Sequence, residues 1–190
     1  MGLMHNLKDY IFVINTMSKE LCSETVEYLK TIEFDENTFY NPNTGVSAPK
    51  SGDSEAEYIY AEECPTKDGL MQAIWDGLLE YHNKYRSPWY DGWNGYSSPR
   101  FNRYKETKEM ALHCDHIHTL FDGEIRGIPI LTCIGLLNDD FAGGEFVLFD
   151  DYSIDLKQGN MIFFPSVFLY PHKVNPVTKG ERYSFASWSW

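Results

Sequence analysis

The second half of the chain is a series of short strand-like runs, and this pattern constrains the fold more than any other feature. From about residue 99 onward, runs rich in β-branched and aromatic residues alternate with turn-forming residues. The runs are RFNRYKE, MALHCDHI, IPILTCIGLL, GEFVLF, SIDL, NMIFF, LYPHKV and RYSFASWSW. Many short strands in sequence, separated by turn signals, predict a sandwich or a jelly roll.

The first half of the chain differs, because most of its apolar residues recur at helical spacing. After a predicted strand at YIFVIN (10–15), Ser18 can cap a helix whose apolar residues continue to Leu29. Residues 68–86 carry an apolar stripe and predict a longer amphipathic helix. Residues 35–65 are polar and rich in turn formers, which predicts a long loop with a short strand at YIYA.

These patterns predict one domain over residues 1–190, of the α+β class and mainly β. The length suffices to bury a sizeable core, and 43% hydrophobic residues is a globular composition. We expect residues 99–190 to form a double-stranded β-helix, or jelly roll, that carries the functional site. Residues 1–98 should supply helical support and loops, with N-terminal helices that buttress one sheet of the core.

Charge and cysteine content restrict the partners and the compartment. The formal net charge of −12 repels phosphate backbones, so we expect no nucleic-acid partner. Four scattered cysteines without a C-x-x-C motif predict reduced thiols and a cytoplasmic protein. The N-terminus lacks the features of a signal peptide, and no apolar stretch approaches a membrane span. The sequence carries no indication of the oligomeric state.

A cluster of metal-ligand side chains lies on the second strand-like run. The segment MALHCDHIHTL (110–120) holds three histidines and an aspartate. Side chains alternate faces along a strand, so His113 and Asp115 share one face, whereas His116 and His118 share the other. Two ligand pairs are therefore possible, H-x-D and H-x-H.

Residues near the C-terminus favour the H-x-D pair. The segment LYPHKVNPVTKGERYSFASW holds His172 and, ten positions later, Arg182. Two histidines and one carboxylate on one face of a barrel form the facial triad of non-haem Fe(II) oxygenases. Such a triad leaves open positions on the metal for O₂ and a chelating co-substrate. A fixed guanidinium nearby can bind a carboxylate through two hydrogen bonds.

From about Pro99 to Trp190 the chain resembles the Fe(II)/2-oxoglutarate-dependent dioxygenases of the prolyl 4-hydroxylase type. The resemblance rests on four ordered blocks, FNRYKETKEMALHCD, LTCIGLLNDDFAGGEFVLF, GNMIFFPS and HKVNPVTKGERYSFASW. Two positions depart from the family pattern. Leu136 stands where the animal oxygen-sensing branch has a tyrosine that helps bind 2-oxoglutarate. Arg182 stands where many prolyl 4-hydroxylases have lysine.

The residues that the resemblance implicates form two groups, Fe(II) ligands and side chains that bind the co-substrate. The implied Fe(II) ligands are His113, Asp115 and His172. The implied co-substrate residues are Arg182, which would pair with the distal carboxylate of 2-oxoglutarate, Ser184, Tyr104 and Trp188. Ser184 lies two residues after Arg182 and therefore shares its strand face.

The resemblance implies hydroxylation of an unactivated C–H bond, with O₂ as oxidant and release of succinate and CO₂. Ascorbate is a candidate reductant. We expect a prolyl residue of a peptide or protein as the substrate. A lysyl residue, a free amino acid or another small molecule would fit the same chemistry.

Two further hypotheses concern the surroundings of the metal. The aromatic residues Trp89, Tyr90 and Trp93 precede the first strand of the barrel, so together with the loop at 35–65 they are expected to flank the substrate entrance. The alternative from another class is a cupin-like metal or small-molecule binding protein that uses the second histidine pair. The block GERYS after His172 argues against that alternative.

Overall fold

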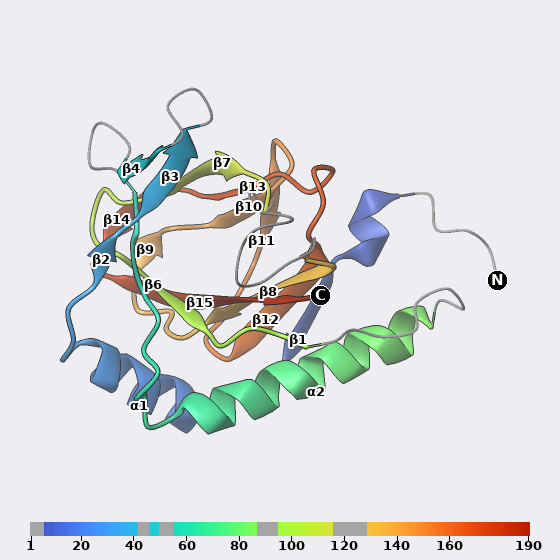
Figure 1. The fold of residues 1–190 in the computed structure, drawn as a ribbon, viewed down its shortest axis with the longest axis horizontal. Coiled ribbons are helices and arrows are strands. Elements are labelled where there is room, and N and C mark those ends of the chain that lie inside the picture. The colour runs from blue at the N-terminus through green and yellow to red at the C-terminus, as the bar shows by residue number, and fades with distance from the viewer. Residues whose placement is uncertain (1–5, 42–45, 50–54, 87–94, 116–128) are drawn as a thin grey trace.

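The structure is a computed structural model that describes residues 6–41, 46–49, 55–86, 95–115 and 129–190 (Figure 1). The elements of the first half are η1 (Leu7–Tyr10), β1 (Phe12–Asn15), α1 (Lys19–Leu29), β2 (Asp35–Glu36), β3 (Thr38–Asn41), β4 (Val46–Pro49), β5 (Glu57–Ile59) and α2 (Lys67–Tyr85). Those of the second half are β6 (Arg100–Tyr104), β7 (Met110–His113), β8 (Leu131–Leu136), β9 (Ala142–Gly143), β10 (Phe146–Leu148), β11 (Tyr152–Ile154), β12 (Asn160–Pro165), β13 (His172–Val174), β14 (Val177–Lys179) and β15 (Arg182–Ser189).

Two antiparallel sheets build the core of the domain. The larger sheet has seven strands in the order β1–β12–β8–β15–β6–β5–β2, and the smaller has four in the order β11–β10–β13–β7. Helices α1 and α2 lie along one side of the larger sheet, and the smaller sheet lies on the other side (Figure 1). This is the predicted double-stranded β-helix, and the helices buttress one of its sheets as expected. All eight predicted strand-like runs contain a strand, and the short strands β9 and β14 pair as an addition.

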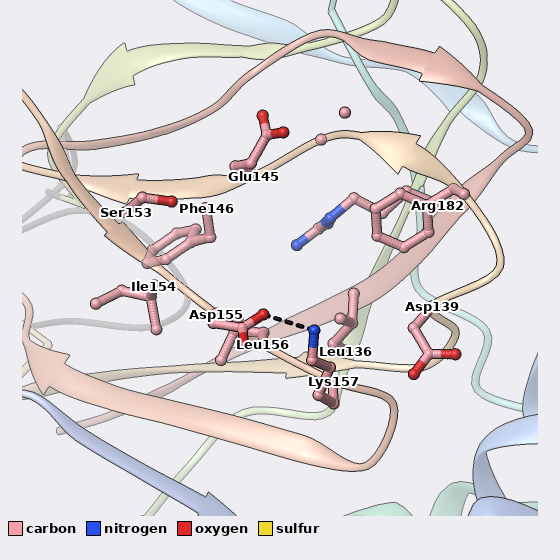
Figure 2. A pocket seen from close by; sticks show the side chains of 13 residues that line it. Leu136, Asp139, Glu145, Phe146, Ser153, Ile154, Asp155, Leu156, Lys157 and Arg182 are labelled. Carbon is pink, nitrogen blue, oxygen red and sulfur yellow. Dashed lines mark ion pairs between the residues drawn. The ribbon is translucent and has the colours of Figure 1, made fainter.

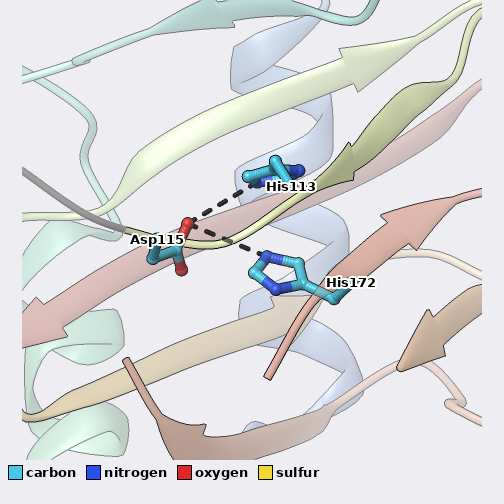
Figure 3. Close-up of side chains that lie close together, drawn as sticks. All are labelled: His113, Asp115 and His172. Atoms are coloured by element: carbon cyan, nitrogen blue, oxygen red, sulfur yellow. Dashed lines mark ion pairs between the residues drawn. The ribbon is translucent and has the colours of Figure 1, made fainter. Parts of the chain in front are cut away.

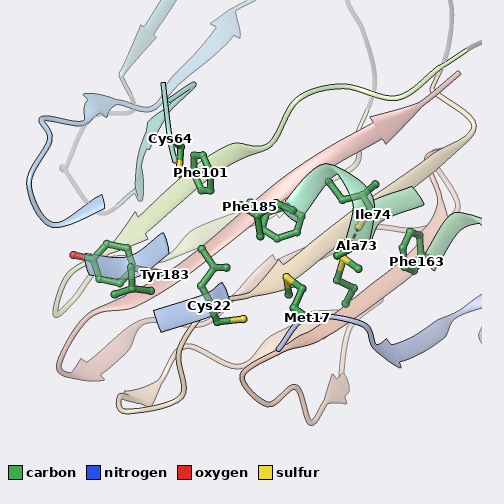
Figure 4. Packing of buried hydrophobic residues seen from close by; sticks show 14 of the residues in the cluster. Met17, Cys22, Cys64, Ala73, Ile74, Phe101, Phe163, Tyr183 and Phe185 are labelled. Atoms are coloured by element: carbon green, nitrogen blue, oxygen red, sulfur yellow. Dashed lines mark hydrogen bonds between the residues drawn. The ribbon is translucent and has the colours of Figure 1, made fainter. Parts of the chain in front are cut away.

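Strand β12 separates two apolar cores because its side chains alternate between the faces of the larger sheet. Met161 and Phe163 pack on the helix side, whereas Ile162 and Phe164 pack between the two sheets. The helix-side core gathers side chains from α1, α2 and the larger sheet (Figure 4). The intersheet core surrounds the pocket described below. The helices therefore hold the larger sheet rigid without occupying the face that carries the site.

Both predicted helices are confirmed. The hydroxyl of Ser18 accepts a hydrogen bond from the backbone N–H of Leu21 at 3.1 Å, which caps α1 as predicted. Helix α2 buries its apolar stripe against the larger sheet. No helix within the described residues is both long and apolar enough to span a membrane.

The prediction of a long loop at residues 35–65 is wrong in part. Strands β2, β3, β4 and β5 all lie in this segment, and the predicted short strand at YIYA corresponds to β5, displaced by one residue. Strand β5 pairs with β6, and β2 pairs with β5, so the segment extends the edge of the larger sheet. Residues 1–98 thus contribute strands as well as helices and loops. This pairing could not be predicted from the sequence, because the segment is rich in residues that are rare in strands.

Gly77 permits the close approach of α2 to β12. A Cβ atom at this position would lie 2.4 Å from Cζ of Phe163, whose side chain is fully buried. We predict that Gly77→Ala lowers the free energy of unfolding. Overpacking costs about 1–3 kcal/mol, more than the roughly 1 kcal/mol that alanine gains over glycine within a helix. Urea denaturation measures the difference.

Gly95→Ala is the matched control, because a Cβ there meets no atom within 4 Å. Equal stability of the two variants would show that α2 shifts without cost and that the close approach is not limiting.

Candidate metal centre and its pocket

Two histidines meet across neighbouring strands of the smaller sheet. His113 ends β7, His172 begins β13, and the two residues face each other in the register. Their rings lie 4.4 Å apart between centroids. The next pair, Val174 with Met110, is shifted, so β7 has one residue more than β13 over this stretch. This bulge places Met110 and His113 on the same pocket although strict alternation would separate them.

Asp115 completes a cluster of three candidate metal ligands. It lies two residues beyond β7, and its carboxylate points toward both imidazoles (Figure 3). Its Oδ1 atom is 3.5 Å from Nε2 of His113 and 3.8 Å from Nε2 of His172. One ion at about 2.1 Å from each ligand atom can span such distances. The ligand atoms of the three residues all lie within 4.8 Å of one another.

Backbone carbonyls orient both imidazoles toward the same point. Nδ1 of His113 lies 2.8 Å from the carbonyl oxygen of Ala111, and Nδ1 of His172 lies 3.1 Å from that of Tyr170. A carbonyl oxygen only accepts, so each Nδ1 donates its proton and each neutral ring keeps the lone pair of Nε2 for a metal. The donor set and its tautomers therefore fit a divalent transition metal.

The larger sheet orients the carboxylate of Asp115. Its Oδ2 atom accepts hydrogen bonds from the hydroxyl of Thr132 at 2.8 Å and from the indole of Trp188 at 3.0 Å. Ser166 lies 2.6 Å from the Thr132 hydroxyl and donates to it, because the Thr132 proton is directed at the carboxylate. With Oδ2 held in this way, Oδ1 faces the histidines as a single ligand atom.

Burial and charge act in opposite directions on the three groups. Burial alone would raise the pKa of Asp115, but the charges and hydrogen bonds of the histidines and Thr132 outweigh it and lower this pKa. Burial lowers the pKa of His172, and Asp115 only partly offsets it. Burial also lowers the pKa of the more accessible His113, but its hydrogen bond to Asp115 prevails and raises it.

The triad opens into a pocket between the two sheets. Strands β6 and β15 are antiparallel neighbours within the larger sheet. Every second side chain of each strand lines one wall of the pocket. From β6 these are Arg100, Asn102 and Tyr104, and from β15 they are Arg182, Ser184, Ala186 and Trp188. In the register Tyr104 opposes Arg182 at one end of this wall, and Arg100 opposes Ala186 toward the other. The wall thus runs from the metal ligands to a buried cation.

Arg182 is that cation, and it is 1% exposed. Its Nη1 donates a hydrogen bond to the Ser184 hydroxyl at 2.7 Å, and its guanidinium carbon lies 4.9 Å from the centroid of the Tyr104 ring. Its Nε atom has no partner, and no described carboxylate forms an ion pair with it. Burial lowers the pKa of Arg182, and the same burial raises that of Tyr104. A buried guanidinium without a counter-ion is prepared to bind an anion.

A second cavity is also lined by Arg182 (Figure 2). The guanidinium points into it beside Phe146, and both residues also line the pocket of the triad. Lys157 pairs with Asp155 at 2.7 Å at the solvent-facing rim. Gly144 supports the arginine stem closely, since a Cβ there would lie 3.0 Å from Cδ of Arg182.

The structure brings together all the predicted ligands and co-substrate residues. Trp188 lines the pocket as expected and also donates to Asp115. The histidines His116 and His118 and the aromatic residues Trp89, Tyr90 and Trp93 lie outside the described residues, so predictions about them stay untested. Tyr96, at the end of that aromatic run, stacks on Trp75 of α2 at 6.1 Å and belongs to the packing of the helix.

Sequence reasoning missed Thr132 and Arg100. Thr132 lies within the apolar run LTCIGLL and is buried. A threonine in such a run could have been predicted to form a hydrogen bond, because a buried hydroxyl without a partner is unfavourable. Its partner Asp115 could not be identified, since that contact depends on how β8 lies relative to the end of β7. Arg100 gave no signal, because arginine at a strand end is ordinary.

The double-stranded β-helix and its cluster of two histidines and one carboxylate have the arrangement found in non-haem Fe(II) oxygenases. Residues 99–190 match the family described as the 2OG-Fe(II) oxygenase superfamily. A PKHD-type hydroxylase of Xylella fastidiosa (strain M23) is 32% identical over 149 residues, which cover 68% of this chain and 57% of that protein. A PKHD-type hydroxylase of Shewanella sp. (strain MR-7) is 37% identical over 94 residues, 47% of this chain and 41% of that protein. The chain belongs to the 2OG-Fe(II) oxygenase superfamily.

Solved structures agree on the fold. A prolyl hydroxylase from Trichoplax adhaerens, in complex with a peptide fragment, superposes with a TM-score of 0.70 at 15% identity, covering 95% of this chain and 83% of that one. A Pseudomonas putida prolyl-4-hydroxylase gives a TM-score of 0.63 at 16% identity, covering 94% and 91%. The chain spans about half the length of the curated relatives it matches.

The hydrogen bonds to Oδ2 of Asp115 should control metal affinity. We predict that Thr132→Val and Trp188→Phe each weaken binding of Fe(II), or of Mn(II) as a stable substitute, by about 10–100-fold. Each change removes one donor. Valine nearly preserves the volume of threonine, and phenylalanine keeps an aromatic ring in place of the larger indole. Titration calorimetry on the metal-free protein measures the effect. Trp75→Phe, on the far side of the larger sheet, is the control, and an equal loss there would indicate a general destabilisation.

Proposed function

We propose that this protein is an Fe(II)- and 2-oxoglutarate-dependent oxygenase that hydroxylates an unactivated C–H bond, with a prolyl residue of a peptide or protein as the favoured substrate. One observation carries the proposal. A single pocket holds a cluster of two histidines and one carboxylate together with a buried arginine that pairs with no described carboxylate. A metal-binding protein without oxygenase activity would need the cluster but not the arginine.

In this proposal His113, Asp115 and His172 hold the iron through Nε2, Oδ1 and Nε2. The bound iron supplies the chemistry that couples O₂ and 2-oxoglutarate to substrate hydroxylation, with succinate and CO₂ as the other products. The protein contributes a fixed facial geometry and an apolar surrounding. The ring of Phe164 lies 5.0 Å from that of His172, and Phe146 lies 5.6 Å from it. These rings exclude water from one side of the site.

Arg182 would bind the distal carboxylate of 2-oxoglutarate, so that the keto and adjacent carboxylate groups reach the metal. Ser184 already accepts a hydrogen bond from this guanidinium and lines the same pocket. Tyr104 covers the guanidinium on one face. Leu136, on the neighbouring strand opposite Ser184, is apolar and leaves the polar contacts to β15 and β6. Ascorbate as a reductant remains a prediction.

A peptide substrate is favoured by the relatives. The curated ones are called hydroxylases, and the Trichoplax enzyme was solved with a peptide bound. A free amino acid or other small molecule remains the second candidate within the same chemistry. None of the described cysteines forms a disulfide, which supports the reducing cytoplasm as the compartment.

The decisive experiment supplies metal-free protein with Fe(II), 2-oxoglutarate and a proline-containing peptide library. We expect succinate release together with peptides that gain the mass of one oxygen atom. His113→Ala, Asp115→Ala and His172→Ala should each lower succinate formation to background, because each removes one of three ligands. Succinate production that persists in all three variants would rule out this metal centre.

Arg182 should affect the binding of 2-oxoglutarate but not the binding of the metal. We predict that Arg182→Ala raises the 2-oxoglutarate concentration for half-maximal turnover by at least about 10-fold, as expected for losing a hydrogen-bonded charge pair. Arg182→Lys should be milder, since it keeps the charge but loses the two-pronged geometry. Metal affinity, measured separately, should not change. An unaltered 2-oxoglutarate requirement in Arg182→Ala would exclude this residue from co-substrate binding.

A further inference from the structure

A second arginine, Arg100, lines the pocket of the triad. Arg100 begins β6, two positions along the same face from Asn102 and four from Tyr104. In the register it opposes Ala186, whereas Arg182 opposes Tyr104. Four residues of extended strand separate the levels of Arg182 and Arg100, or roughly 13 Å. Arg100 therefore lies nearer to the level of Trp188 and the metal ligands than to the predicted end of the co-substrate.

The guanidinium of Arg100 is held in place by the edge of the larger sheet. Its Nη2 donates to the side-chain oxygen of Asn37 at 2.6 Å, and its guanidinium carbon lies 4.3 Å from the centroid of the Tyr58 ring. Both partners are neutral. The ring of Tyr60, whose side chain is half exposed, packs edge-on against Tyr58 at 6.2 Å. The cation is thus positioned beside a partly open aromatic surface.

The charge of Arg100 is not neutralised by any described residue, unlike that of its neighbours. Arg103, on the opposite face of β6, pairs with Glu57 at 2.7 Å, and Lys105 pairs with the same carboxylate at 3.0 Å. No described carboxylate forms an ion pair with Arg100. In a chain with a net charge of −12, Arg100 is thus a second cation of this pocket, besides Arg182, that no described carboxylate neutralises.

We propose that Arg100 binds a carboxylate of the substrate and thereby selects acidic substrates. The proposal rests on the proposed function and specifies the substrate of that site. A fixed guanidinium recognises a carboxylate through paired hydrogen bonds, and its neutral partners leave the remaining donors available. The surrounding negative field repels acidic molecules in general, so the cation confers selectivity at this point of the surface. The carboxylate belongs either to an Asp or Glu beside the hydroxylated residue or to the α-carboxylate of an amino acid.

The experiment compares substrates that differ only in charge. One series contains proline peptides with Asp or Glu beside the proline, and the same peptides with Asn or Gln. The other contains free amino acids and their amides. Wild-type protein should turn over the acidic member of one series at least about 10-fold more efficiently, judged by kcat/KM, than its neutral counterpart. The series that shows the preference identifies the source of the carboxylate.

Arg100→Gln should abolish this preference, because KM should rise for the acidic substrate far more than for the neutral one. Arg100→Glu should reverse the preference toward peptides with Lys at the same position. Arg103→Gln is the matched control, because it removes an arginine of the same strand on the opposite face. It should retain the wild-type preference.

Two outcomes would contradict this inference but leave the proposed function intact. One is wild-type hydroxylation without any preference for acidic substrates in either series. The other is an Arg100→Gln variant that keeps the preference, or that instead raises the 2-oxoglutarate requirement and so assigns Arg100 to the co-substrate. Absence of 2-oxoglutarate-dependent hydroxylation across both series would contradict the proposed function itself, and the inference with it.

Discussion

The carboxylate of Asp115 is the point on which the two sheets of the barrel converge. Its Oδ1 atom faces histidines from the smaller sheet, while Oδ2 accepts hydrogen bonds from Thr132 and Trp188 of the larger sheet. Neither sheet alone could bury this charge, because an unpaired carboxylate in an apolar interior is strongly unfavourable. The site therefore depends on the packing of sheet against sheet, which the helices stabilise from the far side of the larger sheet.

The pocket also concentrates positive charge inside an acidic protein. Among the residues that the structure describes, no carboxylate pairs with the fully buried Arg182, and Arg100 is immobilised by neutral groups. A buried charge without a partner lowers the stability of the fold. An anionic ligand at each of the two side chains would compensate for this cost. The separation of the two along β6 and β15 fits two different carboxylates. This arrangement would let co-substrate and substrate be recognised independently by the same wall of the larger sheet.

The sequence predicted the candidate metal ligands better than the strands and hydrogen bonds that surround them. Local periodicity identified the strands of the barrel and both helices, and the residue types around His113 and His172 indicated the ligands. Strands β2, β3 and β4 were missed, because they are short and lie in a segment rich in turn-forming residues, and because pairing between strands is not visible in the local pattern. The contact of Thr132 with Asp115 was missed for a related reason: it depends on the placement of one sheet relative to the other. Position within one strand can be inferred from alternation, but contact between strands needs the register.

This division suggests where the selectivity of the protein resides. The central strands β8, β12 and β15 pack against a core on both faces, so changes there affect stability and the metal site together. The edge strands β2 and β5 are short and bury few side chains, yet β5 supplies Tyr58 and the turn after β2 supplies Asn37, both of which position Arg100. Substitutions at this edge would then alter the charge presented to a substrate without disturbing the proposed iron ligands. Under the proposed function, the centre of the sheet would determine the reaction and its edge would determine the substrate.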